Sequence, residues 1–227
     1  MQARKNIAVI VAGGSGQRMG ADKPKQFLHL SGLPIIQHTV QAFLDALEDI
    51  EIILVLPKAH LAMAAAIIPK LSKPGSITII EGGATRFHSV KNGLAQIDDP
   101  AVVFIHDGVR PLVSSQLIHS CREHALKYGN AIPAIPMKDS VRQLFPEEGI
   151  NKAVNREHYK IIQTPQTFLS EIIVPAFETT YNESFTDEAT VIEQTGHAVH
   201  LVDGEEGNIK ITRPLDLIIA ESLLNNS

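Results

Sequence analysis

The chain has 227 residues, of which 44% are hydrophobic and 20% charged, with a single cysteine and a formal net charge of −5 at pH 7. A chain of this length and apolar content can bury a core without disulfides, and one cysteine excludes a disulfide framework within the chain. The net negative charge argues against broad nucleic-acid binding, so any cationic site is expected to be local.

The sequence also argues against a membrane or secreted protein. No apolar stretch is long enough to span a bilayer. Residues 1–6 lead straight into a strand pattern, without the hydrophobic segment of a signal peptide. We therefore expect a cytoplasmic protein that binds neither membranes nor nucleic acids.

Short apolar segments alternate with helical patterns through the first 140 residues. Each segment is continuous and rich in Val and Ile, as is typical of strands buried on both faces of a parallel sheet. This order predicts an α/β fold, a Rossmann-like three-layer α/β/α sandwich with a mostly parallel sheet and ligands at the carboxyl ends of its strands. The expected strands are 7–11, 52–56, 77–80, 102–105 and 131–135, and the expected helices are 34–47, 60–71, 87–97 and 114–128.

The pattern changes at residues 137–159. Two alternating stretches, 138–145 and 150–154, flank a Pro-Glu-Glu-Gly turn, which predicts a β-hairpin inserted into the α/β order. A lone hairpin is marginally stable, so it must pack on its own domain or on a partner subunit. Beyond it we expect strands at 161–163 and 197–202, helices at 170–181 and 187–194, and a terminal helix with Thr212 as N-cap and Pro214 and Asp216 in its first turn.

A glycine-rich turn with basic residues follows the first expected strand. Residues 11–25 read VAGGSGQRMGADKPK. Glycines let backbone N–H groups approach phosphates, and Arg18, Lys23 and Lys25 could neutralise them. The turn lacks the Gly-Lys-Ser/Thr of a Walker A loop, and Met19 occupies the third glycine position of the dinucleotide fingerprint. The turn therefore predicts a polyphosphate site of another kind.

Two later strands end in candidate ligand-binding residues. Gly82 and Gly83, with Ser89 one turn into the next helix, would let a planar ligand approach the backbone, although a tight turn is the simpler explanation. Asp107 could bind substrate hydroxyls or hydrated Mg²⁺, or could cap its own loop. One adjacent pair, His106 and Asp107, is too little for a metal site.

Three further residues have simple structural explanations. Thr186 is expected to be the N-cap of the helix that begins at Asp187, and Lys210 an exposed strand lysine. Cys121 lies on the apolar face of its expected helix, which favours a small buried hydrophobe rather than a nucleophile.

Taken in order, these motifs resemble one enzyme family. Residues 12–19 (AGGSGQRM) and 24–27 (PKQF) are similar to the opening of the sugar-phosphate nucleotidylyltransferases. The more specific later blocks occur in the order seen in 2-C-methyl-D-erythritol 4-phosphate cytidylyltransferase, and the match covers nearly the whole chain. These blocks are GGATR at 82–86, HD at 106–107, RP at 110–111, TPQ at 164–166, TDE at 186–188 and NIKITRP at 208–214.

The resemblance implies an isoprenoid-precursor enzyme. It would make 4-diphosphocytidyl-2-C-methyl-D-erythritol and pyrophosphate from CTP and 2-C-methyl-D-erythritol 4-phosphate, with Mg²⁺ bound mainly through the CTP phosphates. It further implies a single nucleotidylyltransferase domain over residues 1–227, and a homodimer whose arm is the hairpin at 138–159.

The resemblance also assigns roles to residues. Arg18, Lys25 and Lys210 would neutralise the CTP phosphates, and Arg156, from the partner's arm, would hold the phosphate of the second substrate. Asp107 is a weak metal candidate, and no metal site is assigned. The nucleotide-binding residues would be Ala12, Gly13, Gly14, Ser15, Gly16, Gly82, Gly83 and Ser89, and the acceptor-binding residues Asp107, Arg110, Ser140, Thr164 and Thr186.

The implied reaction needs no strong general base, because the nucleophile is already a phosphate oxyanion. Ribitol-5-phosphate cytidylyltransferase remains an alternative with a different polyol phosphate, and a catalytically silent nucleotide-binding regulator is an alternative of another class. UTP or GTP with a sugar 1-phosphate is a further one. Departures from the family pattern at Ala84, the Gly108-Val109 pair, Ser140 and Asn155 leave the phosphate-binding residues intact.

Overall fold

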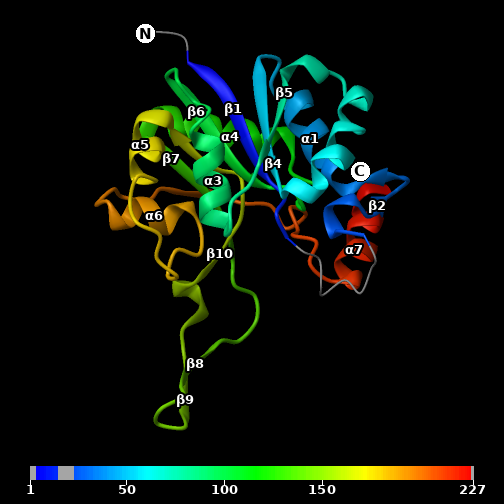
Figure 1. Ribbon diagram of the computed structural model, residues 1–227. Helices are drawn as coiled ribbons and strands as arrows, with labels where there is room; N and C mark the ends of the chain where they lie inside the picture. The colour runs from blue at the N-terminus through cyan, green and yellow to red at the C-terminus, as the bar shows by residue number, and fades with distance from the viewer. Residues whose placement is uncertain (1–3, 15–22, 226–227) are drawn as a thin grey trace.

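A central sheet flanked by helices organises residues 4–14 and 23–225, the part of the chain that the computed structural model describes (Figure 1). In that part the sheet has eight strands in the order β10-β7-β11-β6-β1-β4-β5, and β12 also pairs with β7. β5, β4, β1 and β6 run parallel, whereas β10 and β11 run antiparallel to their neighbours. The strands are β1 (Lys5–Val11), β4 (Ile50–Leu56), β5 (Ile77–Glu81), β6 (Ala101–Asp107), β7 (Asn130–Pro136), β10 (Lys160–Ile162), β11 (Gln166–Leu169) and β12 (Leu201–Asp203).

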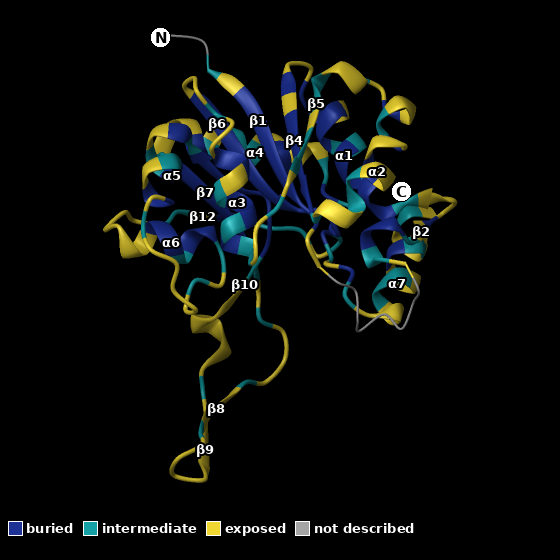
Figure 2. Cartoon of the chain, in the orientation of Figure 1, coloured by how far each residue is buried: buried dark blue, intermediate teal, exposed yellow. Residues whose placement is uncertain are grey.

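Helices pack on both faces of the sheet, which confirms the expected three-layer sandwich. Within β1, Ala8 and Ile10 belong to the core on one face, and Ile7 and Val9 to the core on the other. This alternation follows from strand geometry, and burial of both faces explains why the strands are continuously apolar (Figure 2). One face is covered by α1 (Ile35–Ala46), α2 (Leu61–Ala65) and α4 (Ser115–Tyr128), the other by α3 (Arg86–Leu94), α5 (Ser170–Ala176) and α6 (Glu188–Gln194).

Some elements differ from expectation. The helix expected at 60–71 consists of α2 and a separate 3-10 turn, Ile68–Lys70, because Pro69 cannot donate a helical hydrogen bond. The helix expected at 170–181 ends at Ala176, and the strand expected at 197–202 is the shorter β12. β11 was not predicted. It has only four residues, and its partners β6 and β7 lie far back in the sequence.

The C-terminal helix α7 (Pro214–Asn225) starts differently from the prediction. Asp216 Oδ2 accepts hydrogen bonds from the backbone N–H groups of Thr212 and Arg213, at 2.7 and 2.8 Å, and from the Thr212 hydroxyl at 2.9 Å. Thr212 is therefore a donor to Asp216 and not the N-cap acceptor. Pro214 and Asp216 do lie in the first turn, as expected.

A third apolar cluster lies beside the main core. Ala220 of α7 packs with Ile35 and Val109, and the cluster also contains Leu30 of the short hairpin formed by β2 (His29–Leu30) and β3 (Leu33–Pro34). Ile211 completes it and lies next to the predicted site residue Lys210. No helix of the described residues is long and apolar enough to cross a membrane.

The predicted hairpin is present as an arm that projects from the body of the molecule (Figure 1). It consists of β8 (Arg142–Phe145) and β9 (Ile150–Ala153), which pair only with each other in the strand pairings of the described chain. Leu144 is 68% exposed and Ile150 44% exposed, and most of the arm is open to solvent (Figure 2).

Candidate active site

Two cavities meet at the carboxyl ends of the central strands. The first, about 300 Å³, lies between the turn that follows β1 and the turn that follows β5. The second, about 190 Å³, lies between β6, the β10–β11 connection and the start of α6. Arg86, Asp107 and Lys210 line both cavities, so the two share a cationic wall around one carboxylate.

The cavities gather most of the predicted site residues. Of the predicted phosphate- and nucleotide-binding residues, the first cavity is lined by Ala12, Gly13, Gly14, Lys25, Gly82, Gly83, Ser89 and Lys210. Of the predicted acceptor-binding residues, the second is lined by Asp107, Arg110, Thr164 and Thr186.

Five of the predicted residues are not among those that line the two cavities in the described part of the chain. Ser15, Gly16 and Arg18 fall outside the described residues. Ser140 and Arg156 are exposed at the base of the arm and line neither cavity of this chain. Arg156 Nη1 donates a hydrogen bond to the carbonyl of Lys138. Its predicted role is in a partner's site, which the geometry of one chain does not test.

The turn after β5 leaves no room for side chains at its two glycines. A Cβ on Gly83 would lie 2.4 Å from Cβ of His88, and one on Gly82 would lie 2.8 Å from Oγ of Ser89. Ser89 fixes the turn, because its Oγ accepts from the Gly83 N–H at 3.1 Å and donates to the Thr85 carbonyl at 2.9 Å. The turn is thus both tight and able to present bare backbone to a ligand.

Lys25 is held against the first turn by its neighbours. It begins the 3-10 turn Lys25–Phe27, and a Cβ on Gly14 would lie 3.1 Å from Cε of Lys25. The buried side chain of Gln26 donates from Nε2 to the carbonyl of Ala12 at 2.8 Å. The PKQF segment is therefore tied to the glycine-rich turn, which directs Lys25 into the first cavity.

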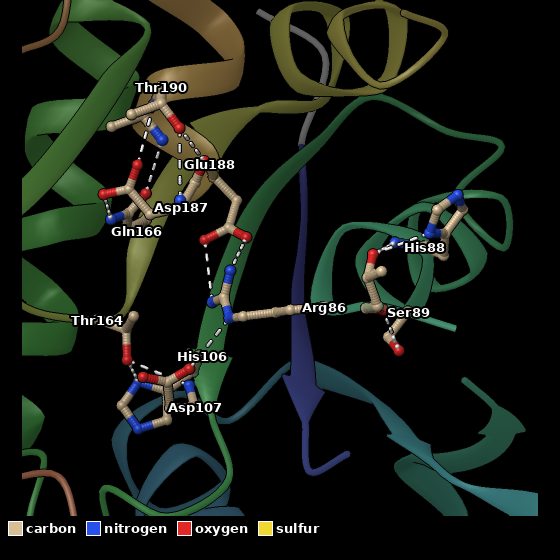
Figure 3. Close-up of polar contacts among 12 residues, drawn as sticks. Arg86, His88, Ser89, His106, Asp107, Thr164, Gln166, Asp187, Glu188 and Thr190 are labelled. Atoms are coloured by element: carbon tan, nitrogen blue, oxygen red, sulfur yellow. Dashed lines mark hydrogen bonds and ion pairs between the residues drawn. The ribbon is translucent and has the colours of Figure 1, made fainter. Parts of the chain in front are cut away.

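Asp107 is the electrostatic centre of the site. Lys210 Nζ lies 2.9 Å from Oδ2 and Arg110 Nε lies 3.4 Å from Oδ2. On the other oxygen, Oδ1, Arg86 Nε lies at 3.3 Å (Figure 3). Burial by itself would raise the pKa of Asp107, but Arg86, Lys210 and Arg110 outweigh it and hold the pKa far below its usual value. Three cations around one carboxylate leave the wall net positive, which suits phosphate groups.

Lys210 is exposed, as its alternating surroundings suggested, but it lies in a loop and not in a strand, and its ammonium group contacts Asp107. Residues 208–212 form a loop, and two hydrogen bonds fix it on either side of Lys210. The buried Asn208 donates from Nδ2 to the Thr164 carbonyl at 2.8 Å, and Ile211 N–H donates to the Val109 carbonyl at 2.9 Å. Through this second bond, Val109 of the Gly108-Val109 pair helps to position the loop that carries Lys210.

Two of the departures from the family pattern, Gly108 and Asn155, have local reasons. A Cβ on Gly108 would lie 2.9 Å from Cβ of Ala12, so glycine relieves crowding between the ends of β6 and β1. Asn155 caps the 3-10 turn Arg156–His158 by accepting from the Glu157 N–H at 3.1 Å. Aspartate would cap this turn equally well.

The sequence did not indicate an ion pair between the half-buried Arg86 of the shared wall and a buried glutamate. Arg86 makes two hydrogen bonds to Glu188, which is 1% exposed and is the first residue of α6 (Figure 3). The blocks GGATR and TDE contain both residues, but nothing in their spacing indicates that they meet.

The N-cap of α6 was also misassigned. The cap is Asp187, whose Oδ1 accepts from the Thr190 N–H at 3.0 Å in a capping box. Gln166 Nε2 donates to the other oxygen of Asp187 at 2.9 Å, which ties α6 to β11. Thr186, the predicted cap, instead lines the second cavity.

His106 is a buried neutral side chain that fixes the loop at the end of β6. Its Nδ1 lies 3.0 Å from Oγ1 of Thr164, and its Nε2 lies 3.1 Å from the carbonyl of Arg110. Burial lowers the pKa of His106 to about 4. The described part of the chain holds no group of three or more His, Cys, Asp or Glu side chains that could bind a metal ion.

This burial predicts a loss of stability in mild acid. In the unfolded chain His106 binds a proton near pH 6.5, but in the fold only near pH 4, so the free energy of unfolding should fall as pH drops through this window. A difference of this size corresponds to about 3 kcal/mol. Denaturant unfolding at intervals between pH 7 and 4 would measure it. The same series on His106→Gln should have a visibly flatter slope, and equal slopes would contradict the assignment.

Comparisons with known proteins agree with this geometry. The family model of IspD, 2-C-methyl-D-erythritol 4-phosphate cytidylyltransferase, matches residues 6–226. The chain is 45% identical over 224 residues to the protein of that name from Porphyromonas gingivalis strain W83, covering 98% of this chain and 99% of the relative. It is 41% identical over 220 residues to the one from Bacteroides thetaiotaomicron, covering 97% and 100%.

Solved structures lead to the same family. The chain superposes on 4-diphosphocytidyl-2C-methyl-D-erythritol synthase from Anaerococcus prevotii with a TM-score of 0.84 at 30% identity, covering 98% of this chain and 96% of that one. The corresponding TM-score for the cytidylyltransferase from Thermus thermophilus is 0.74 at 30% identity, covering 96% and 98%. Sequence and structure together show that the chain belongs to the 2-C-methyl-D-erythritol 4-phosphate cytidylyltransferase family.

Proposed function

We propose that this chain transfers the cytidylyl group of CTP to 2-C-methyl-D-erythritol 4-phosphate, forming 4-diphosphocytidyl-2-C-methyl-D-erythritol and pyrophosphate for isoprenoid precursor synthesis. An oxygen of the acceptor phosphate attacks the α-phosphorus of CTP, and the bond to the β-phosphate breaks. The observation that carries the proposal is the pair of cavities that share Arg86, Asp107 and Lys210.

The proposal assigns CTP to the first cavity and the polyol phosphate to the second. The first cavity combines bare backbone at Gly82 and Gly83 with Lys25 beside the glycine-rich turn, which suits a base and a polyphosphate. The second adds Arg110 and the hydroxyls of Thr164 and Thr186, which suit a polyol phosphate. Their meeting point is where two anions must approach each other, so cations held there stabilise the charge of the transition state.

Mg²⁺ would reach the site on the triphosphate. Asp107 was the metal candidate, but its carboxylate is already paired with three cationic side chains, which does not fit a direct magnesium ligand. The proposal therefore gives Asp107 the role of holding Lys210 and Arg110, and assigns no protein ligand to the metal.

A homodimer is the proposed assembly. Leu144 and Ile150 expose apolar surface, and the cross-strand pairs Leu144–Asn151 and Phe145–Ile150 place these two side chains on opposite faces of the arm. Apolar groups on both faces of an isolated hairpin favour coverage by a second copy. That copy would receive Arg156, from the base of the arm, at its acceptor cavity.

The direct test is an acceptor screen. The protein, with Mg²⁺, is incubated with CTP, UTP or GTP and with methylerythritol phosphate, ribitol 5-phosphate or a sugar 1-phosphate, and pyrophosphate release is measured. Turnover is expected with CTP and methylerythritol phosphate. Preference for ribitol 5-phosphate would overturn the acceptor, and CTP binding without turnover for any acceptor would favour a regulator.

A further inference from the structure

An ion pair between the half-buried Arg86 and the buried Glu188 lies next to the wall that the two cavities share. Arg86 is the first residue of α3 and Glu188 the first residue of α6. The guanidinium donates two hydrogen bonds to Glu188, one of them 3.1 Å from Nη2 to Oε2, while its Nε lies 3.3 Å from Asp107 (Figure 3). One side chain thus connects the turn of the nucleotide cavity, the end of β6 and the helix that borders the acceptor cavity.

Both helices that carry the pair are fixed at their first turns. The side chain of Thr85 caps α3, and Asp187 caps α6 in a capping box. Gln166 ties the start of α6 to β11, because its Oε1 accepts from the Ala189 N–H at 2.8 Å. The position of Arg86 is therefore set by rigid elements on both sides.

Glu188 competes with Asp107 for the guanidinium of Arg86. Burial opposes the charge of Arg86, but Glu188 and then Asp107 outweigh it and raise the pKa of Arg86 above its usual value. Among the ion pairs of the described residues Glu188 has no other cationic partner, whereas Asp107 also holds Lys210 and Arg110. Without the charge of Glu188, Arg86 would turn fully to Asp107 and compete with Lys210 for it.

We infer that Glu188 is a positioning residue for the transfer reaction: by engaging Arg86 it leaves Asp107 free to hold Lys210 where the two cavities meet. This inference rests on the proposed function. Glu188 acts through Arg86 and Asp107 on both Lys210, which lines the two cavities, and Arg110, which lines only the acceptor cavity. Its loss should therefore affect the acceptor more than CTP, because the nucleotide turn also has its own support from Ser89.

The test is the Glu188→Gln variant, which keeps the shape of the side chain and loses its charge. The KM for methylerythritol phosphate should rise on the order of 10-fold, the scale of one hydrogen bond to a charged group. The KM for CTP should rise less, because Lys25 and the turn at Gly82 and Gly83 also line the nucleotide cavity. Glu188→Asp keeps the charge and should recover part of the acceptor affinity. A role in stability alone would lower the melting temperature and leave both KM values unchanged, and that result would overturn the inference.

The chain provides a matched control. Arg4 and Glu171 also form an ion pair with two hydrogen bonds. Arg4 directly precedes β1, so this pair lies at the amino ends of the strands, away from the cavities at their carboxyl ends. Glu171→Gln should leave both KM values at the wild-type level. If Glu188→Gln does not fold, Arg86→Lys serves in its place, since lysine keeps the charge but cannot bridge both carboxylates. An unchanged acceptor KM there would contradict the inference.

Wild-type turnover in the same assay reports on the proposed function. An inactive wild type would overturn that function and, with it, the role of Glu188. An active wild type with an unaltered acceptor KM in Glu188→Gln would contradict the positioning role alone.

Discussion

Replacing Lys25 by alanine should reduce turnover by about 10²–10³, the cost of removing one oxyanion-stabilising group in other enzymes. Lys25 lines the nucleotide cavity next to Gly14, where the proposed function places the phosphates of CTP. Attack of one phosphate on another accumulates negative charge in the transition state, so a missing cation should lower kcat. A CTP-dependent pyrophosphate-release assay measures this directly.

A nearby lysine supplies the control for Lys25. Lys23 is exposed two residues earlier and does not line either cavity. Lys23→Ala should therefore retain close to wild-type turnover, and both variants should keep the wild-type sedimentation behaviour. Near-normal turnover of Lys25→Ala would contradict the assignment of this lysine.

Removing residues 141–154 should convert the proposed dimer into a monomer and abolish most turnover. The deletion takes away the exposed apolar groups of the arm and displaces Arg156 from the partner's acceptor cavity. The ends of the deleted segment are adjacent, because Val154 N–H donates to the Val141 carbonyl at 3.3 Å, so a short glycine linker can join them. Sedimentation measures the mass against 24.7 kDa for one chain.

A point variant distinguishes loss of the dimer interface from misfolding of the domain. Leu144→Asp places a charge on the arm, where Leu144 is 68% exposed, and should weaken the dimer without affecting the folded domain. Leu126→Asp, at a 42% exposed position on α4, should leave the mass unchanged. An unaltered oligomeric state after deletion of the arm would refute an interface built by it.

The local pattern of the sequence predicted the sheet, but not all of its strands. Continuous runs such as residues 7–11 identify strands buried on both faces, because burial leaves no polar face. β11 has only four residues, and its place in the sheet depends on backbone pairing with β6 and β7, both of which lie at least 30 residues earlier in the sequence. Periodicity within a segment does not contain that information.

The same distinction applies to the site. The glycine-rich turn indicated a polyphosphate by itself, because phosphate binding depends on local backbone and neighbouring cations. Lys210 and Glu188 could not be interpreted in this way. Their chemistry depends on Asp107 and Arg86, which lie about 100 residues away in sequence, and only the fold brings them together.

The place of β11 in the sheet also bears on how the chain is made. β6 pairs with β1 along one side, and its other side pairs with Gln166–Leu169. A nascent chain that has not yet reached residue 166 therefore carries an open strand edge on β6, and such edges are templates for aggregation. This edge stays uncovered until residues 166–169 have been synthesised, so late synthesis is the stage at which β6 is most open to pairing with another chain.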